Sequence, residues 1–340
     1  MIPLGSTSGA PSLAPESRPD SRFPAGNVST PPGLARRQVR RVVAVGGGKG
    51  GIGKTLVAVN VAIALAQKGQ RVVIVDADLG GANVHTCLGI AQPRTTLTDY
   101  VDRKVSRLEE VRIPSGIPNL SLIGGALDAL DVANLKFQQK HKLLRNLHTL
   151  EADTVVLDLG AGTHFNVLDF FLVAHHGVLV LLPEPTSIEN AYRFIKSAFF
   201  RKIQDLDTVS IDSVIETALS TREGALRTPL DFIGRARAID PEAAERVEQE
   251  LENFRVRLVV NQSRGSADED VGDAVVSAWR KFFGLNLDYL GAIAYDDDAW
   301  RAVRRRRPLL MDRPDSPSAV AIRRIVDNLL ALDARRPIPP

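Results

Sequence analysis

Residues 46–55 read Gly-Gly-Gly-Lys-Gly-Gly-Ile-Gly-Lys-Thr, and this stretch decides the fold. From Gly48 to Thr55 it matches the phosphate-loop (P-loop) pattern G-x-x-x-x-G-K-[ST]. The preceding Arg41–Val45 is a β-branched run, typical of a buried parallel strand. The following Leu56–Gln67 is rich in alanine, has a helical period and stops before Gly69. Strand, glycine-rich loop and helix are the context that this motif requires, so we expect the chain to bind a nucleoside triphosphate.

The loop itself supplies most of the expected nucleotide contacts. Its glycines allow successive backbone N–H groups to turn toward an anion, and the new helix adds the positive end of its dipole. Lys54 is expected to reach the β- and γ-phosphates, and the Thr55 hydroxyl to ligate Mg²⁺. The predicted nucleotide-binding residues of the loop are Gly48, Lys49, Gly50, Gly51, Ile52, Gly53, Lys54, Thr55 and Leu56.

Composition limits the classes of protein that remain. The chain has 340 residues, 44% of them hydrophobic, which is enough for a full core. Its formal charge of +3 does not by itself indicate a nucleic-acid or membrane partner. A single cysteine, Cys87, excludes a disulfide framework and a C-x-x-C metal or iron–sulfur carrier. No apolar run approaches the ~18 residues of a membrane span, and no secretory signal is visible. We therefore expect a cytoplasmic protein.

The chain divides into a tail and one folded domain. Residues 1–40 are rich in proline and serine and have no apolar period, so we expect a disordered tail. Residues 41–335 are expected to form a single P-loop ATPase domain. Residues from about 205 to 255 break the regular pattern and predict a helical insertion. Within it, Asp240 is placed to cap a helix over Pro241–Phe254, and Pro241 to open it.

Short apolar strands alternate with helices through the rest of the domain. This alternation predicts an α/β fold with a doubly wound, mostly parallel sheet. Such sheets bind ligands at the carboxyl ends of their strands. Several candidate site residues follow predicted strands at such ends: Gly48, Asp78, Asp158, Pro183 and Asn261. Asp158 ends the strand Thr154–Leu157 and precedes Gly160-Ala161-Gly162, so we interpret it as the Walker-B acid, which holds Mg²⁺ through water.

The second lysine of the loop carries a family resemblance. The run K-G-G-I-G-K-T resembles the deviant P-loop of the MinD/ParA ATPases, which have the SIMIBI type of P-loop fold. In that family the first lysine reaches across a two-fold interface to the ATP of the partner. The resemblance implies that Lys49 acts in trans and Lys54 in cis. It also implies that ATP and Mg²⁺ are the cofactors and that ATP drives homodimerisation.

A second motif strengthens this resemblance. Residues 76–84, Asp-Ala-Asp-Leu-Gly-Gly-Ala-Asn-Val, match the D-x-D-x-G switch sequence of the family. By this resemblance Asp78 orients or deprotonates the attacking water, and Asp76 supports the Mg²⁺ shell. Asn261, after Arg257–Val260, matches an asparagine whose amide reads the adenine edge. Glu184, in Pro183-Glu184-Pro185, lies in another nucleotide-side loop and is expected to contact the ribose or the partner chain.

Within the family, the chain is most similar to the FlhG/FleN branch, the MinD-like regulators of flagellar number and placement. The switch sequence and the late I-A-Y-D-D-D segment before R-R-R-P carry this similarity. Two features depart from it: the tail lacks a D-Q-A-x-x-L-R-like segment, and the helical insertion is acidic. The resemblance implies an ATPase that is weak until a partner stimulates it. Its role would be to position a flagellum, a division site or a similar polar assembly through an activating or cargo protein.

Two alternatives stay open at this stage. The first is a ParA-like partition ATPase whose ATP-bound dimer binds nonspecific DNA through Arg304, Arg305, Arg306 and Arg307. The second is a peripheral contact with the inner face of the cell membrane. The sequence shows no C-terminal amphipathic foot, because only Asp333–Pro340 follows the last predicted helix, Pro317–Leu332. That helix is expected to pack on the sheet.

Overall fold

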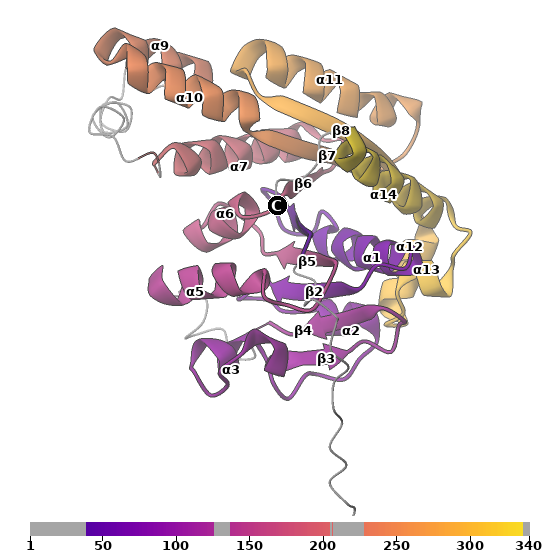
Figure 1. Cartoon of the computed structure of the whole chain (residues 1–340). Coiled ribbons are helices and arrows are strands. Elements are labelled where there is room, and N and C mark those ends of the chain that lie inside the picture. Colours follow the sequence, from indigo (N-terminus) through magenta and orange to yellow (C-terminus); the bar gives the residue numbers. More distant parts are fainter. Residues whose placement is uncertain (1–38, 126–136, 205, 207–227, 336–340) are drawn as a thin grey trace, which may run out of the picture. The chain divides into compact units, whose positions relative to one another are not determined.

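An eight-stranded sheet forms the centre of the domain (Figure 1). The structure is a computed structural model, and it describes residues 39–125, 137–204, 206 and 228–335. The strand order is β3-β4-β2-β5-β1-β6-β7-β8. Seven of these strands run parallel, and β3 pairs antiparallel with β4 at one edge. The strands are β1 Arg41–Gly46, β2 Val72–Ala77, β3 Arg112–Pro114, β4 Leu120–Ile123, β5 Thr154–Leu159, β6 His176–Leu181, β7 Arg255–Ser263 and β8 Asn286–Ala294. The predicted doubly wound, mostly parallel sheet is confirmed.

Helices cover both faces of this sheet (Figure 1). One face carries α1 Lys54–Gln67, α2 Val84–Leu88, α12 Asp297–Arg304, α13 Leu309–Asp312 and α14 Pro317–Arg335. The other face carries α3 Leu97–Val101, the 3-10 helix η1 Leu108–Val111, α5 Phe137–Leu147, α6 Phe165–Leu172, α7 Pro185–Gln204, α9 Pro229–Ile239, α10 Pro241–Asn253 and α11 Ser266–Phe283. Strand β1 shows why both faces are apolar: Val42 and Ala44 join one core, and Val43 and Val45 join the other.

The position of β1 determines where the P-loop emerges. The strand lies between β5 and β6, and the chain passes from one half of the sheet to the other at this point. The carboxyl ends of β1, β5 and β2 are level, because Val45 and Asp76 are both in register with Asp158. An open α/β sheet binds ligands at such a switch point.

The described part of the predicted insertion is a pair of helices, α9 and α10. The Asp240 side chain accepts hydrogen bonds from the backbone N–H groups of Glu242, at 3.0 Å, and Ala243, at 3.1 Å. Pro241 is the first residue of α10, so the predicted cap and start of this helix are confirmed. Residue 205 and residues 207–227 of the insertion, and residues 1–38 of the predicted tail, lie outside the described residues.

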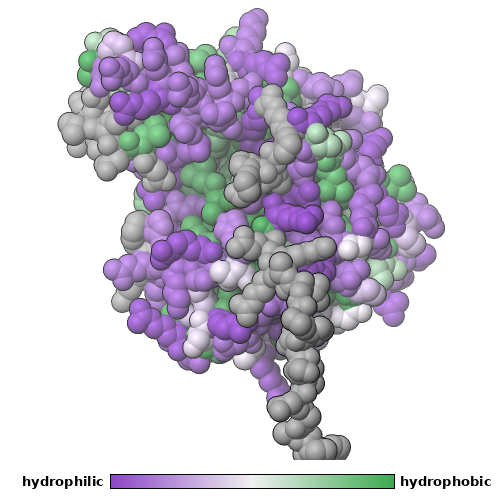
Figure 2. Space-filling view, in the orientation of Figure 1, coloured by the Kyte–Doolittle hydropathy of each residue, from purple (hydrophilic) through white to green (hydrophobic). Residues whose placement is uncertain are grey.

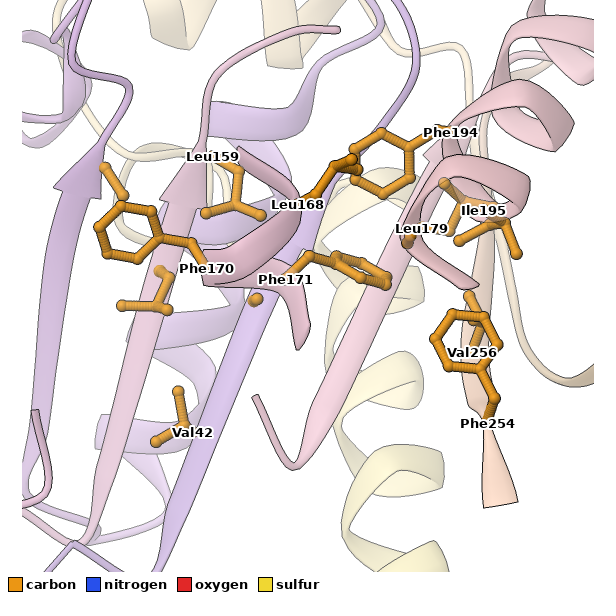
Figure 3. Packing of buried hydrophobic residues seen from close by; sticks show 14 of the residues in the cluster. Val42, Leu159, Leu168, Phe170, Phe171, Leu179, Phe194, Ile195, Phe254 and Val256 are labelled. Carbon is orange, nitrogen blue, oxygen red and sulfur yellow. The ribbon is translucent and has the colours of Figure 1, made fainter. Parts of the chain in front are cut away.

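Helix α6 anchors the centre of one face through aromatic packing (Figure 3). The rings of Phe171, on α6, and Phe194, on α7, meet edge to face with their centroids 5.0 Å apart. Gly177 makes room for the Phe171 ring, because a Cβ there would lie 2.5 Å from it. Outside this core, polar residues cover most of the face seen in Figure 2, and a hydrophobic area lies between the positions of α6 and α7 in Figure 1.

Truncation of Phe171 tests this packing. Phe171→Ala is expected to lower the free energy of unfolding by about 3–5 kcal/mol, because it removes a buried ring and leaves a cavity. The matched control is Phe282→Ala, since the Phe282 side chain is 60% exposed whereas Phe171 is 3% exposed. The control is expected to change the free energy by no more than about 0.5 kcal/mol. Urea unfolding of both variants is the measurement, and equal losses would contradict the packing described here.

Candidate nucleotide-binding site

The P-loop leaves β1 and enters α1 in a conformation that only glycine allows at two places. Gly53, the residue before α1, has φ +89°, in the left-handed region. Gly48 has a different reason, because a Cβ there would collide with the backbone carbonyl of Asn190 on α7. The loop therefore lies closely against the N-terminal part of α7.

The two lysines of the loop differ in their surroundings. Lys54 is 8% exposed, and its Nζ donates a hydrogen bond of 3.2 Å to the carbonyl oxygen of Lys49. Burial lowers the pKa of Lys54, and the negative charges of Asp158 and Asp78 oppose this effect. The side chain of Lys49 is exposed. One lysine is therefore directed into its own loop and the other toward the surroundings of the protein.

Asp158 is the most unusual charge in the site. It is 0% exposed at the end of β5, and within the described part of the chain neither carboxylate oxygen accepts a hydrogen bond of ordinary geometry, although the Thr55 hydroxyl lies close by. Burial raises the pKa of Asp158 well above its usual range, and the neighbouring charge of Asp76 adds to this rise. The Thr55 hydroxyl and the Lys54 ammonium act in the opposite direction. A buried carboxylate without a partner is costly unless a cation compensates it.

Asp76 joins the site to the switch segment. Its carboxylate accepts hydrogen bonds from the backbone N–H groups of Asp78, at 3.3 Å, and Val84, at 2.9 Å. The second bond holds the start of α2. Burial is the largest cause that raises the pKa of Asp76 to about 7. Asp76 therefore fixes the backbone on both sides of the loop that carries Asp78.

The predicted Mg²⁺ ligands fit a nucleotide-bound ion. Among the residues that the structure describes, no group of three or more His, Cys, Asp or Glu side chains could hold a metal ion by itself. Mg²⁺ usually takes one or two protein ligands and completes its shell with phosphate oxygens and water. The unpartnered Asp158 carboxylate and the adjacent Thr55 hydroxyl are such a donor set. These two residues would hold the ion, which would supply charge neutralisation at the phosphates.

Asp78 lines a cavity of about 850 Å³ beside the loop. Its carboxylate lies against the backbone of Gly160, since a Cβ on Gly160 would be 3.0 Å from Asp78 Oδ1. Residues that sequence reasoning missed line the same cavity: Lys140, His164, Phe165, Asn166 and Arg201. Both Lys140 and Arg201 bind the carboxylate of Asp169, on α6. These residues come from α5, from α6 and the residue before it, and from α7, and they belong to no motif, so only the fold brings them together.

The two remaining predicted residues lie at the carboxyl ends of β6 and β7. Asn261 is 4% exposed, and its Nδ2 donates a hydrogen bond of 2.8 Å to the carbonyl oxygen of Ile52 in the P-loop. The Glu184 side chain is exposed, and its carbonyl oxygen accepts from the backbone N–H groups of Ser187 and Ile188 at the start of α7. Thr55 and Leu56 are half-buried in the first turn of α1. The structure thus brings together the P-loop, Asp76, Asp78, Asp158 and Asn261, whereas Glu184 is directed outward.

The buried acids predict how stability depends on pH. A carboxylate whose pKa is raised by folding contributes stability below the unfolded value of 3.8. This contribution is lost as the pH rises through the folded pKa, which is about 7 for Asp76. The stability that these two acids contribute to the nucleotide-free protein is therefore expected to decline between about pH 4 and pH 7.

Asp158→Asn should remove part of this loss, because it replaces the buried charge with a neutral group of the same shape. We expect a gain of about 1–3 kcal/mol in the free energy of unfolding at pH 8 without nucleotide, and no gain near pH 4. In the same variant, ATP with Mg²⁺ should stabilise the protein no more than ATP alone does. Urea unfolding at several pH values measures this, and a variant less stable than the parent at pH 8 would contradict it.

Comparison with known proteins agrees with this geometry. The chain matches the ParA family, described as "NUBPL iron-transfer P-loop NTPase", over residues 38–216. The antiactivator FleN of Pseudomonas aeruginosa is 26% identical over 292 residues, which are 85% of this chain and 86% of FleN. The flagellum site-determining protein YlxH of Helicobacter pylori is 32% identical over 167 residues, which are 46% of this chain and 53% of YlxH.

Solved structures show the same fold. The cell division ATPase MinD of Pyrococcus furiosus has a TM-score of 0.59 and 20% identity, and the alignment covers 86% of this chain and all of that one. MinD of Pyrococcus horikoshii, in complex with Mg-ADP, also has a TM-score of 0.59 at 20% identity and covers 88% of this chain. No helix within the described ranges is both long and apolar enough to span a membrane. The family match covers more than half of the sequence and includes the P-loop, the switch segment and Asp158, so this chain belongs to the ParA family of P-loop NTPases.

Proposed function

We propose that this protein is a MinD/FlhG-like ATPase switch that dimerises with ATP, hydrolyses it to ADP and phosphate, and positions a cellular structure through a protein partner. The observation that carries the proposal is the contrast between the two P-loop lysines. Lys54 is buried and bonded to its own loop, whereas the Lys49 side chain is exposed. An exposed lysine beside a phosphate site is free to reach a nucleotide bound to a second copy of the chain.

The proposed reaction assigns a role to each group around the γ-phosphate. The loop N–H groups and Lys54 bind the phosphates, and the Asp78 carboxylate orients the attacking water and accepts its proton. The water oxygen bonds to the γ-phosphorus while the bond from that phosphorus to the β–γ bridging oxygen breaks. Lys49 of the second copy offsets the negative charge that develops on the phosphoryl oxygens. Turnover is slow until the dimer and a stimulating partner complete this arrangement.

The names of the relatives support the biological role. FleN is an antiactivator, YlxH determines the flagellum site, and MinD of Aquifex aeolicus was solved in a complex with MinC. We infer that this chain likewise regulates the placement of a flagellum, a division site or a similar polar assembly in the cytoplasm. Helix α14 does not itself serve as a membrane foot in this proposal, because it buries Ile322, Ile325, Val326 and Leu329 in the core.

The alternative of a DNA-binding partition ATPase has one supporting observation. Arg304, the last residue of α12, and the following Arg305, Arg306 and Arg307 are all exposed. Arg305 and Arg307 pair with Asp312, and the Arg304 guanidinium lies 4.7 Å from the centre of the Trp300 ring. Two of the four arginines thus share the single carboxylate of Asp312, which offsets one of the four positive charges. A DNA mobility shift that requires ATP and weakens steeply with salt would favour the alternative.

Separate substitutions of the two lysines test the proposed dimer. Lys49→Ala is expected to keep ATP binding but lose ATP-dependent dimerisation and hydrolysis, because the trans contact disappears while Lys54 remains. Lys54→Ala is expected to lose nucleotide binding itself. Light scattering with and without ATP separates the two results, and Lys281→Ala, at an exposed lysine of α11, is the control. A Lys49→Ala protein that dimerises like the parent would contradict the trans role.

Asp78→Ala tests the assignment of the water-positioning group. ATP binding should survive, because the loop, Lys54, Thr55 and Asp158 are unchanged, and turnover should fall by roughly 10²–10⁴-fold. ATP-bound dimers should then accumulate. The measurement pairs the affinity for a fluorescent ATP analogue with phosphate release, and Asp102→Ala, at an exposed aspartate after α3, is the control. Hydrolysis at the parental rate would assign the water to another group, and loss of ATP binding would place Asp78 in the Mg²⁺ shell.

A further inference from the structure

The side chain of Asn261 makes its closest described contacts with the P-loop. Its Nδ2 donates to the Ile52 carbonyl oxygen at 2.8 Å, and the bond is buried. A Cβ on Gly53 would collide with the same nitrogen. The asparagine therefore lies directly against the peptide that joins Ile52 to Gly53, the residue before Lys54.

The backbone next to Asn261 is irregular. Gln262, the next residue, has φ +60°, which is uncommon for a residue with a side chain. The register between β7 and β8 shifts between Asn261 and Ser263. A residue held in the left-handed region costs of order 1 kcal/mol and persists only where the surroundings fix it. The end of β7 is thus distorted at the residue that follows the P-loop contact.

The hydrogen bond also fixes the direction of the next N–H group. In a trans peptide the carbonyl and the N–H point in opposite directions. Because the Ile52 carbonyl is directed to Asn261, the N–H of Gly53 is directed to the other side of the loop. If this peptide turned over, a carbonyl oxygen would replace an N–H donor on that side and would repel a phosphate.

We propose that Asn261 is a positioning residue for the triphosphate, acting through the Ile52–Gly53 peptide whichever base the nucleotide carries. The inference rests on the proposed nucleotide binding and deepens it. It separates two roles for the same amide. Base reading would affect only nucleotides with the matching base, whereas support of the loop affects every ligand that carries the phosphates.

The test measures the affinity of the full chain, with Mg²⁺, for ATP, GTP and inorganic tripolyphosphate by titration calorimetry. Asn261→Ala removes the bond and leaves the Ile52 carbonyl unpaired, so it should weaken all three ligands by a similar factor of about 10–100. Asn261→Asp keeps the shape but has no N–H donor, and it should weaken them in the same way. The control is Asn328→Ala, which removes a less buried amide hydrogen bond of similar length, 2.9 Å, to the carbonyl of Leu290, between α14 and β8. The control should leave all three affinities unchanged.

Hydrogen exchange keeps the test decisive if Asn261→Ala unfolds. In the Asn261→Asp protein the amides of Gly53 and Lys54 should exchange faster than in the parent, while the amides of β1 should not. If the amides of Gly53 and Lys54 and the amides of β1 show the same change in exchange rate between parent and variant, the result would count against the proposal.

The outcomes separate the two roles and the two proposals. If Asn261→Ala weakens ATP but leaves tripolyphosphate unchanged, Asn261 reads the base and the positioning role is overturned. If the parent binds tripolyphosphate but not ATP, the ATPase proposal fails, yet the tripolyphosphate comparison still decides the role of Asn261. If the parent binds neither ligand, both proposals are overturned.

Discussion

A buried carboxylate without a partner is the constraint around which this site is arranged. Burial of the Asp158 carboxylate at the end of β5 carries a desolvation cost, and nearby cationic groups offset this cost. Lys54 approaches it from the P-loop, and the Thr55 hydroxyl lies beside it. The level ends of β1, β2 and β5 bring these groups to the same edge of the sheet. The nucleotide-free fold therefore keeps a buried acid whose natural complement is a bound cation.

The sequence predicts the parts of the site that depend on one continuous segment. The P-loop, the strand that precedes it, and the positions of Asp76 and Asp158 at strand ends all follow from local motifs and hydrophobic runs. Strand β3 was missed because it has three residues, includes Arg112 and Pro114, and lies at an edge. Such a strand leaves no apolar run in the sequence.

Features that depend on packing between distant segments were not visible in the sequence. The cavity beside Asp78 is lined by side chains from α5, α6 and α7 that share no motif. The shared carboxylate of Asp169 joins Lys140 to Arg201, which are 61 positions apart in the sequence. Asn261 and Ile52 are 209 positions apart in the sequence. The local motifs identify each of them as a site residue, but they do not show that the Asn261 amide binds the Ile52 carbonyl oxygen.

The P-loop glycines described above are constrained for different reasons, and this has an evolutionary consequence. Gly48 cannot be replaced for steric reasons, because a Cβ there would collide with the backbone of α7. Gly51 has open space around it but φ +77°, a conformation that asparagine also adopts. Gly50 has neither restriction, since its nearest neighbour is a methyl group at 4.0 Å. By steric and backbone constraints alone, relatives of this chain can therefore carry any residue at position 50 and asparagine or glycine at position 51. The same constraints require glycine at position 48.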